Sequence, residues 1–162
     1  LAKAGVHMTY NRQLIQPIGN TARPLHVFDK FDTRVAILKL FPGITEEVVA
    51  AVLDIPSLRG VVLETFGAGN APSHEWLYER LRAAVDRGVV IVNKTQCNTG
   101  SVSMGQYAVS LNLLKAGVIS GYDITTEALL TKMMHVLGEM GDDLEKMKQT
   151  LSVSICGELT KA

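Results

Sequence analysis

The chain has 162 residues, of which 47% are hydrophobic and 20% charged, and its 16 basic residues balance its 16 acidic residues. This length predicts one domain with a sizeable core, and the absence of a basic stripe or a long apolar run predicts no nucleic-acid and no membrane partner. The two cysteines, Cys97 and Cys156, are too far apart in sequence to indicate a disulfide framework. A reducing, cytoplasmic location is therefore expected.

The first 32 residues are predicted to be an interdomain connector or linker. Val6–Tyr10 has the pattern of a short strand, and residues 11–24 are polar with two prolines and a glycine, which is typical of a loop. The chain begins without methionine and without the apolar centre of a signal peptide. We therefore expect a fragment or a trimmed protein, with an α/β domain over residues 33–162.

Strand patterns and helix patterns alternate through the rest of the chain. In chain order they predict a strand at Val35–Leu40, a helix at Thr45–Leu53, a strand at Gly60–Glu64, a helix at Glu75–Asp86, a strand at Val89–Val92, a helix at Met104–Leu114, a strand at Val118–Ser120, a helix at Thr125–Leu137, a turn at Gly138–Gly141, a helix at Asp142–Leu151 and a weakly ordered tail at Val153–Leu159. This alternation predicts a three-layer, Rossmann-like or flavodoxin-like α/β domain. Its four-stranded sheet should be mostly parallel, with helices on both faces.

The segment from Val61 to Pro72, VVLETFGAGNAP, is the strongest functional candidate. Its apolar start predicts a strand buried on both faces, and its two glycines and its proline force the backbone to turn. A loop between a parallel strand and a helix lies at the edge of the sheet where ligands bind, and Asn70 at its tip has an amide that donates and accepts. A tight turn without a ligand remains the alternative interpretation.

Three segments begin like known cofactor-binding or catalytic motifs, but each lacks a residue that its motif requires. A dinucleotide fingerprint needs glycine where Pro72 stands and an acid after the third strand, which ends at Asn93. A zinc-protease helix starting at His74 needs histidine where Tyr78 stands. Ser103 lacks the glycine two residues before it that a serine-hydrolase nucleophile needs, so helix capping is favoured. No metal and no cofactor are expected.

Polar residues also follow the third and fourth strands, at the edge where the glycine loop is expected. Thr95 and Cys97 come after the third strand, and Asp123 and Glu127 after the fourth. Cys97 is either a thiol that lines a pocket or an inert one. The two acids either point into a shared crevice or serve only as helix-capping and dipole partners.

The blocks GAGNAP, VVIVNKTQC and AGVISGYDITTEALLTK together resemble the smaller, C-terminal domain of type I, cytoplasmic-type L-asparaginase. The resemblance covers Val35 to Leu159 and ends in a family-like CGELT, while the early AGVHMTYN resembles the region between the two domains. It implies hydrolysis of L-asparagine to L-aspartate and ammonia by the whole enzyme. In the family, the nucleophilic threonine and the second threonine with its lysine and aspartate partners belong to the N-terminal domain. This chain has no counterpart of that domain, so it should be inactive alone.

The resemblance also implies partners and site residues. The partners are L-asparagine, the chain's own N-terminal catalytic domain and further copies in a dimer or tetramer, and Asn70 would be lent to the active site of a neighbouring subunit. Some members bind asparagine at a second, allosteric site, whose matching positions are Thr95, Cys97 and Glu127. That site uses arginine where Glu64 stands here, and an acid cannot clamp an α-carboxylate. The alternatives are a regulatory module that binds asparagine and a pure oligomerisation domain.

Overall fold

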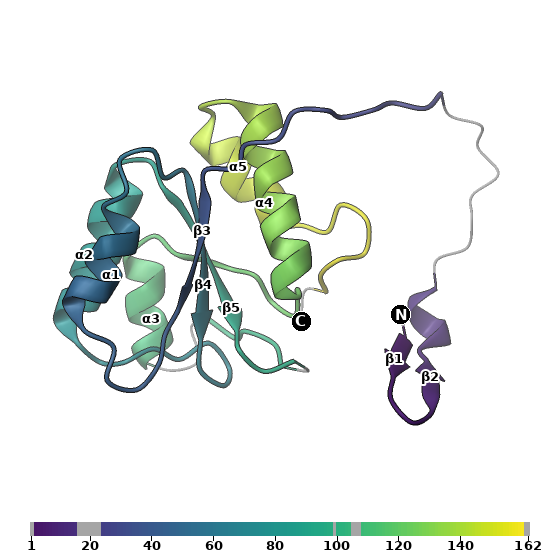
Figure 1. Ribbon diagram of the computed structural model, residues 1–162, viewed down its shortest axis with the longest axis horizontal. Helices are drawn as coiled ribbons and strands as arrows, with labels where there is room; N and C mark the ends of the chain where they lie inside the picture. Colours follow the sequence, from purple (N-terminus) through teal and green to yellow (C-terminus); the bar gives the residue numbers. More distant parts are fainter. Residues whose placement is uncertain (1, 16–23, 99, 105–107, 161–162) are drawn as a thin grey trace.

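The computed structural model describes residues 2–15, 24–98, 100–104 and 108–160. A short antiparallel hairpin and a 3₁₀ turn precede an α/β domain, as Figure 1 shows. The elements in chain order are β1 (Ala2–Ala4), β2 (Met8–Tyr10), η1 (Arg12–Leu14), β3 (Val35–Lys39), α1 (Glu46–Leu53), β4 (Gly60–Thr65), α2 (Glu75–Asp86), β5 (Val90–Thr95), α3 (Ala108–Lys115), β6 (Ile119–Ser120), α4 (Thr126–Met140) and α5 (Leu144–Leu151).

A parallel sheet forms the middle layer of the domain. Within the described residues it has four strands in the order β3-β4-β5-β6. β4 and β5 are buried along their whole length and pair from Gly60 with Val90 to Thr65 with Thr95. Helices α1, α2 and α3 cover one face and α4 and α5 the other (Figure 1). The predicted three-layer α/β fold is confirmed.

Each face of the sheet has its own apolar core. Val61, Leu63 and Ile91 pack with α1, α2 and α3, whereas Val62 and Val92 pack with α4 and α5. Successive residues of a strand point to opposite faces, which is why neighbouring residues fall into different cores. We call the side of the sheet covered by α1–α3 the first face and the side covered by α4 and α5 the second face. The polar residues that end β4 and β5 are divided between the two faces by the same alternation.

The predicted turn at Gly138–Gly141 is wrong at its start, because α4 continues to Met140 and ends at Gly141, which has a positive φ of 61°. Glycine stands at position 138 because the preceding connector crosses the helix there. A Cβ atom at this position would collide with the carbonyl oxygen of Lys30, and the Asp32 N–H donates to the Met134 carbonyl at 2.9 Å. The connector therefore runs along α4 before it enters the sheet.

Other boundaries differ less. β5 extends to Thr95, three residues beyond the end of the strand predicted at Val89–Val92. The helix predicted from Met104 is observed from Ala108, and residues 105–107 lie outside the described residues.

From the end of α5 to Thr160, the chain has no regular secondary structure but is held by a buried ion pair. Lys132 of α4 donates to the Glu158 carboxylate at 2.7 Å and to the backbone carbonyls of Leu151 and Val153. The Lys132 and Glu158 side chains are only 4% and 9% exposed. A lysine buried this deeply needs a partner charge and further acceptors, and this segment provides them.

The same ion pair makes the stability of the chain depend on pH. Burial by itself would raise the pKa of Glu158, but hydrogen bonds from Lys132 and from the N–H groups of Cys156 and Ile155 outweigh it and hold the pKa well below its usual value. A carboxylate whose pKa is lower in the folded state stabilises the fold above its unfolded pKa. This contribution is lost progressively as the pH falls below about 5, from the unfolded pKa toward the lower folded pKa.

We predict that Glu158→Gln lowers the free energy of unfolding at pH 7 by about 3–5 kcal/mol, because Lys132 is left buried without its counter-charge. The variant should also lose less stability than the wild type between pH 6 and pH 3. Denaturant unfolding at a series of pH values measures both effects. Glu145→Gln is the matched control, because the Glu145 side chain is exposed in its pair with Lys148. Equal pH profiles for the wild type and Glu158→Gln would contradict this account.

Candidate functional site

The glycine loop after β4 is a tight turn that carries Asn70. The Phe66 N–H donates to the Asn70 carbonyl and the Asn70 N–H to the Phe66 carbonyl, both at 2.8 Å. Two glycines allow the turn, because Gly67 and Gly69 have positive φ values of 49° and 104°. Phe66 and Ala71 pack against the core of the first face. The chain thus turns back beside that core and leaves the Asn70 side chain half-buried at the edge of the sheet.

Two side chains of β5 donate hydrogen bonds to backbone carbonyls of this loop. Asn93 donates from its side-chain amide to the Gly69 carbonyl at 3.3 Å, and the Thr95 hydroxyl donates to the Gly67 carbonyl. Asn93 accepts in turn from the Thr65 hydroxyl at 2.6 Å. All three side chains are buried, and the register of β4 with β5 places them on the first face. The roles of Asn93 and Thr65 were not predicted from the sequence, although polar residues that follow apolar strands were a signal for them.

Glu64 lies on the second face, at the start of α4. Its carboxylate accepts from the Thr126 hydroxyl at 2.5 Å and pairs with Lys39 at 3.7 Å. The Glu64 side chain is only 11% exposed, so these two partners compensate for much of the solvation that it loses. Thr125 caps the helix by accepting from the Ala128 N–H. Glu64 therefore fastens α4 to the sheet.

A hollow of about 290 Å³ opens beside this contact, at the carboxyl edge of β5. It contains one cationic side chain, Lys94, and two acidic ones, Asp123 and Glu127, and the exposed Cys97 also faces it. Among the described residues, its lining is Lys94, Cys97, Asn98, Gly100, Asp123, Ile124, Thr125, Thr126 and Glu127. Mixed charges in a space of this size suit a small zwitterion.

The predicted site residues therefore share one edge of the sheet but not one cavity. Cys97 and Glu127 line the hollow, and Glu64 contacts its wall through Thr126. Asn70 and Thr95 are absent from its lining: Asn70 is in the glycine loop, and Thr95 bonds to that loop from β5 on the first face. The Asp123 carboxylate both lines the hollow and accepts from the Thr160 N–H at 2.6 Å, so it also fixes the C-terminal segment.

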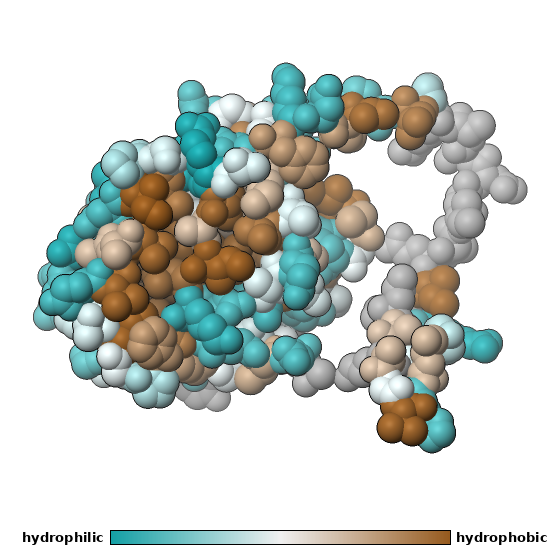
Figure 2. Space-filling model, in the orientation of Figure 1, coloured by the Kyte–Doolittle hydropathy of each residue, from teal (hydrophilic) through white to brown (hydrophobic). Residues whose placement is uncertain are grey.

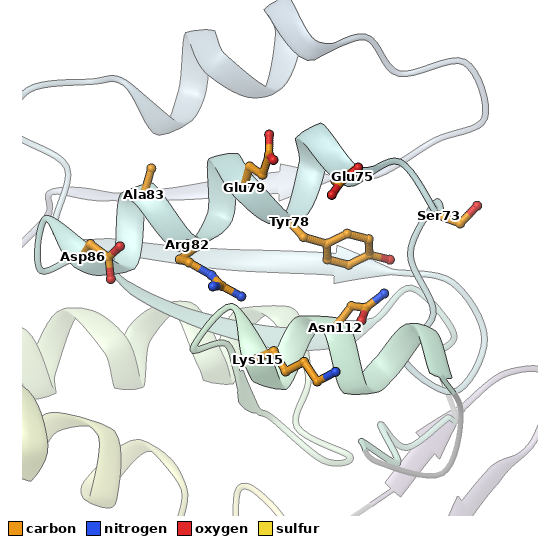
Figure 3. A pocket seen from close by; sticks show the side chains of 9 residues that line it. All are labelled: Ser73, Glu75, Tyr78, Glu79, Arg82, Ala83, Asp86, Asn112 and Lys115. Carbon is orange, nitrogen blue, oxygen red and sulfur yellow. The ribbon is translucent and has the colours of Figure 1, made fainter.

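A second hollow, of about 540 Å³, lies between α2 and α3. Figure 3 shows Tyr78 in this space, facing Asn112, while Glu79 and Ala83 point to the other side of α2. The Tyr78 hydroxyl donates to the Pro72 carbonyl at 2.9 Å, which connects α2 to the end of the glycine loop. None of the predicted site residues lines this hollow.

The ranges that the structure describes contain no group of three or more His, Cys, Asp or Glu side chains placed to hold a metal ion. In the same ranges, every helix is too short or too polar to span a bilayer.

Residues 34–151 match the family described as "Glutaminase/Asparaginase C-terminal domain". The chain is 43% identical over 160 residues to the 60 kDa lysophospholipase of Homo sapiens and 37% identical over 160 residues to L-asparaginase 1 of Escherichia coli K12. Each alignment covers 99% of this chain, but only 27% of the human protein and 46% of the E. coli protein. The crystal structure of L-asparaginase I from Vibrio cholerae superposes with a TM-score of 0.85 at 35% identity, over 99% of this chain and 48% of that one. The chain thus spans half or less of the relatives that it matches.

The two loop glycines give a matched pair of substitutions. A Cβ atom at Gly69 would lie 2.8 Å from Val102 Cγ1 and 3.1 Å from Asn93 Nδ2, whereas one at Gly67 meets nothing within 4 Å. We predict that Gly67→Ala lowers the free energy of unfolding by about 1–2 kcal/mol, from backbone conformation alone. Gly69→Ala should lower it by about 3–4 kcal/mol, because overpacking adds to the same strain. Denaturant unfolding measures both, and equal losses would contradict the described packing.

Proposed function

Because the chain belongs to the glutaminase/asparaginase C-terminal domain family, we propose that the protein containing it hydrolyses L-asparagine to L-aspartate and ammonia. L-Asparagine is favoured as the substrate because the E. coli relative and the V. cholerae structure are both named as L-asparaginases. The nucleophilic threonine and its partners would come from a preceding catalytic domain, as the family resemblance implies. Residues 1–32 would then connect the two domains, and the two unpaired cysteines favour a cytoplasmic location.

Asn70 is the residue through which this domain would take part in the reaction. Its backbone N–H and carbonyl are both engaged with Phe66, so the side-chain amide is the group that the turn offers outward. An amide held on a tight turn can orient a substrate and the catalytic groups around it, which is a positioning role. The single observation that carries this proposal is the locked turn that presents Asn70 at the edge of the sheet.

An active site completed by a neighbouring subunit requires self-association, as a dimer or tetramer. β3 is one of the two edge strands of the sheet within the described residues. Figure 2 shows apolar surface over β3 and α1, and the exposed hydrophobic residues there are Ile37, Phe41, Val48 and Ile55. An unpaired edge strand beside exposed apolar side chains favours a protein interface.

We predict that Asn70→Ala in the full-length protein lowers kcat for L-asparagine about tenfold to a hundredfold, because the substrate and the catalytic groups lose a positioning contact. Stability should change by less than about 1 kcal/mol, since the side chain is half-buried on a loop. Steady-state kinetics and thermal unfolding measure these effects. Asn112→Ala, an exposed asparagine on α3, is the control and should leave kcat unchanged.

The 162-residue chain by itself should show no turnover of L-asparagine, and also none of a lysophospholipid, the substrate named for the human relative. Unchanged kinetics for Asn70→Ala would remove Asn70 from the site. Turnover by the chain alone would show that the proposed division of labour between two domains is wrong.

The hollow at the start of α4 supports a second candidate function, a regulatory site for asparagine. Glu64 stands where the allosteric site of the resembling family uses arginine. Lys94, however, lines the hollow and provides a cation for an α-carboxylate. Asp123 and Glu127 provide carboxylates for an α-ammonium group. Charge of both signs thus remains available to an amino acid in spite of Glu64.

We predict saturable binding of L-asparagine to the chain in titration calorimetry, weakened at least tenfold by Lys94→Met because the α-carboxylate loses its counter-charge. Lys115→Met, which removes a lysine from the hollow between α2 and α3, should bind as the wild type does. Absence of binding heat, or equal affinity in Lys94→Met, would remove this second function and leave the first one untouched.

A further inference from the structure

The turn that carries Asn70 has all of its backbone carbonyls hydrogen-bonded. From Phe66 to Asn70, each carbonyl oxygen accepts from at least one donor. In order, the donors are the Gly69 and Asn70 N–H groups, the Thr95 hydroxyl, the Ser103 N–H, the Asn93 amide and the Phe66 N–H. A loop whose backbone carbonyls are all hydrogen-bonded has little freedom to move.

Only two of these donors are side chains, and both belong to β5. Thr95 bonds to Gly67 and Asn93 bonds to Gly69, the two residues of the turn with positive φ. Glycine has no side chain that could restrict its backbone, so the peptide groups on either side of it rotate easily unless something else holds them. Asn93 and Thr95 are 0% and 1% exposed, and their positions are set by the central strand of the sheet. They therefore fix the two peptides that the sequence leaves most free.

Thr95 uses its hydroxyl twice. It donates to the Gly67 carbonyl and accepts from the Cys97 N–H at 3.0 Å. One hydroxyl has a single proton to donate, so this one is committed to the turn. The contacts of Thr95 are thus those of a residue that holds the turn, which differs from the ligand-binding role that the family resemblance implied.

We propose that Thr95, with Asn93, is a positioning residue for Asn70: it holds the turn in the one geometry from which the Asn70 amide reaches the substrate. This inference rests on the proposed role of Asn70. Loss of the Thr95 hydroxyl should widen the distribution of Asn70 positions, and small displacements of a positioning group lower turnover strongly.

The test compares Thr95→Val, which keeps the shape but removes the hydroxyl, with Thr95→Ser, which keeps the hydroxyl. In the full-length protein, kcat for L-asparagine should fall about tenfold in Thr95→Val and stay within about twofold in Thr95→Ser. The decisive measurement is a double-mutant cycle with Asn70→Ala. If Thr95 acts through Asn70, Thr95→Val should cause no further loss once the Asn70 amide is gone. Equal losses in both backgrounds would overturn the proposal while leaving the role of Asn70 intact.

A second measurement on the 162-residue chain is independent of activity. Amide hydrogen exchange of Gly69 and Asn70 should be at least tenfold faster in Thr95→Val than in Thr95→Ser, because the turn opens more often without the hydroxyl. If Thr95→Val fails to fold, Asn93→Ser takes its place in this measurement. Its short side chain cannot reach Gly69, so the same increase in exchange is expected. Unchanged exchange would refute the positioning role. Faster exchange, together with full activity of Asn70→Ala, would show instead that the proposed function is wrong.

Discussion

The parallel pairing of β4 with β5 is the constraint on which the rest of the domain depends. It aligns Thr65 with Thr95 at the carboxyl edge, and the alternation of side chains then sends Thr65, Asn93 and Thr95 to one face and Glu64 and Lys94 to the other. The first group holds the turn that carries Asn70. On the second face Glu64 fastens α4 and Lys94 lines the hollow beside it. One edge of the sheet thus supports two separate candidate sites.

Much of this architecture could be predicted because local sequence determines it. The apolar run Val61–Leu63 has no alternation, which indicates a strand buried on both faces, and β4 is buried throughout. The two glycines of GAGNAP require positive backbone angles, so a turn was expected where it occurs. Helix α2 begins and ends at the predicted residues, Glu75 and Asp86. Asn70 was identified as a candidate because its polar side chain sits at the tip of that turn.

The features that were missed all depend on contacts between distant segments. Asn93 and Thr95 resemble loop residues by polarity, yet both are buried because Thr65, Gly67 and Gly69 provide partners. Gly138 resembles a helix terminator, but it is a crossing point for the connector at Lys30. The separation of the site residues into two groups depends on how far β5 extends, and a hydrophobicity pattern does not detect polar residues at the end of a strand.

If the turn built on β4 and β5 presents Asn70 to the active site of a neighbouring subunit, as we propose, two impaired variants should complement each other in mixed oligomers. Full-length protomers carrying Asn70→Ala are mixed with protomers that lack the nucleophilic threonine of the upstream domain but keep Asn70, and the subunits are allowed to exchange. The parent without the threonine should be inactive and the Asn70→Ala parent should keep only its lowered turnover. The mixture should exceed both parents, because mixed oligomers contain one complete site. A mixture that is no more active than its parents would contradict the account.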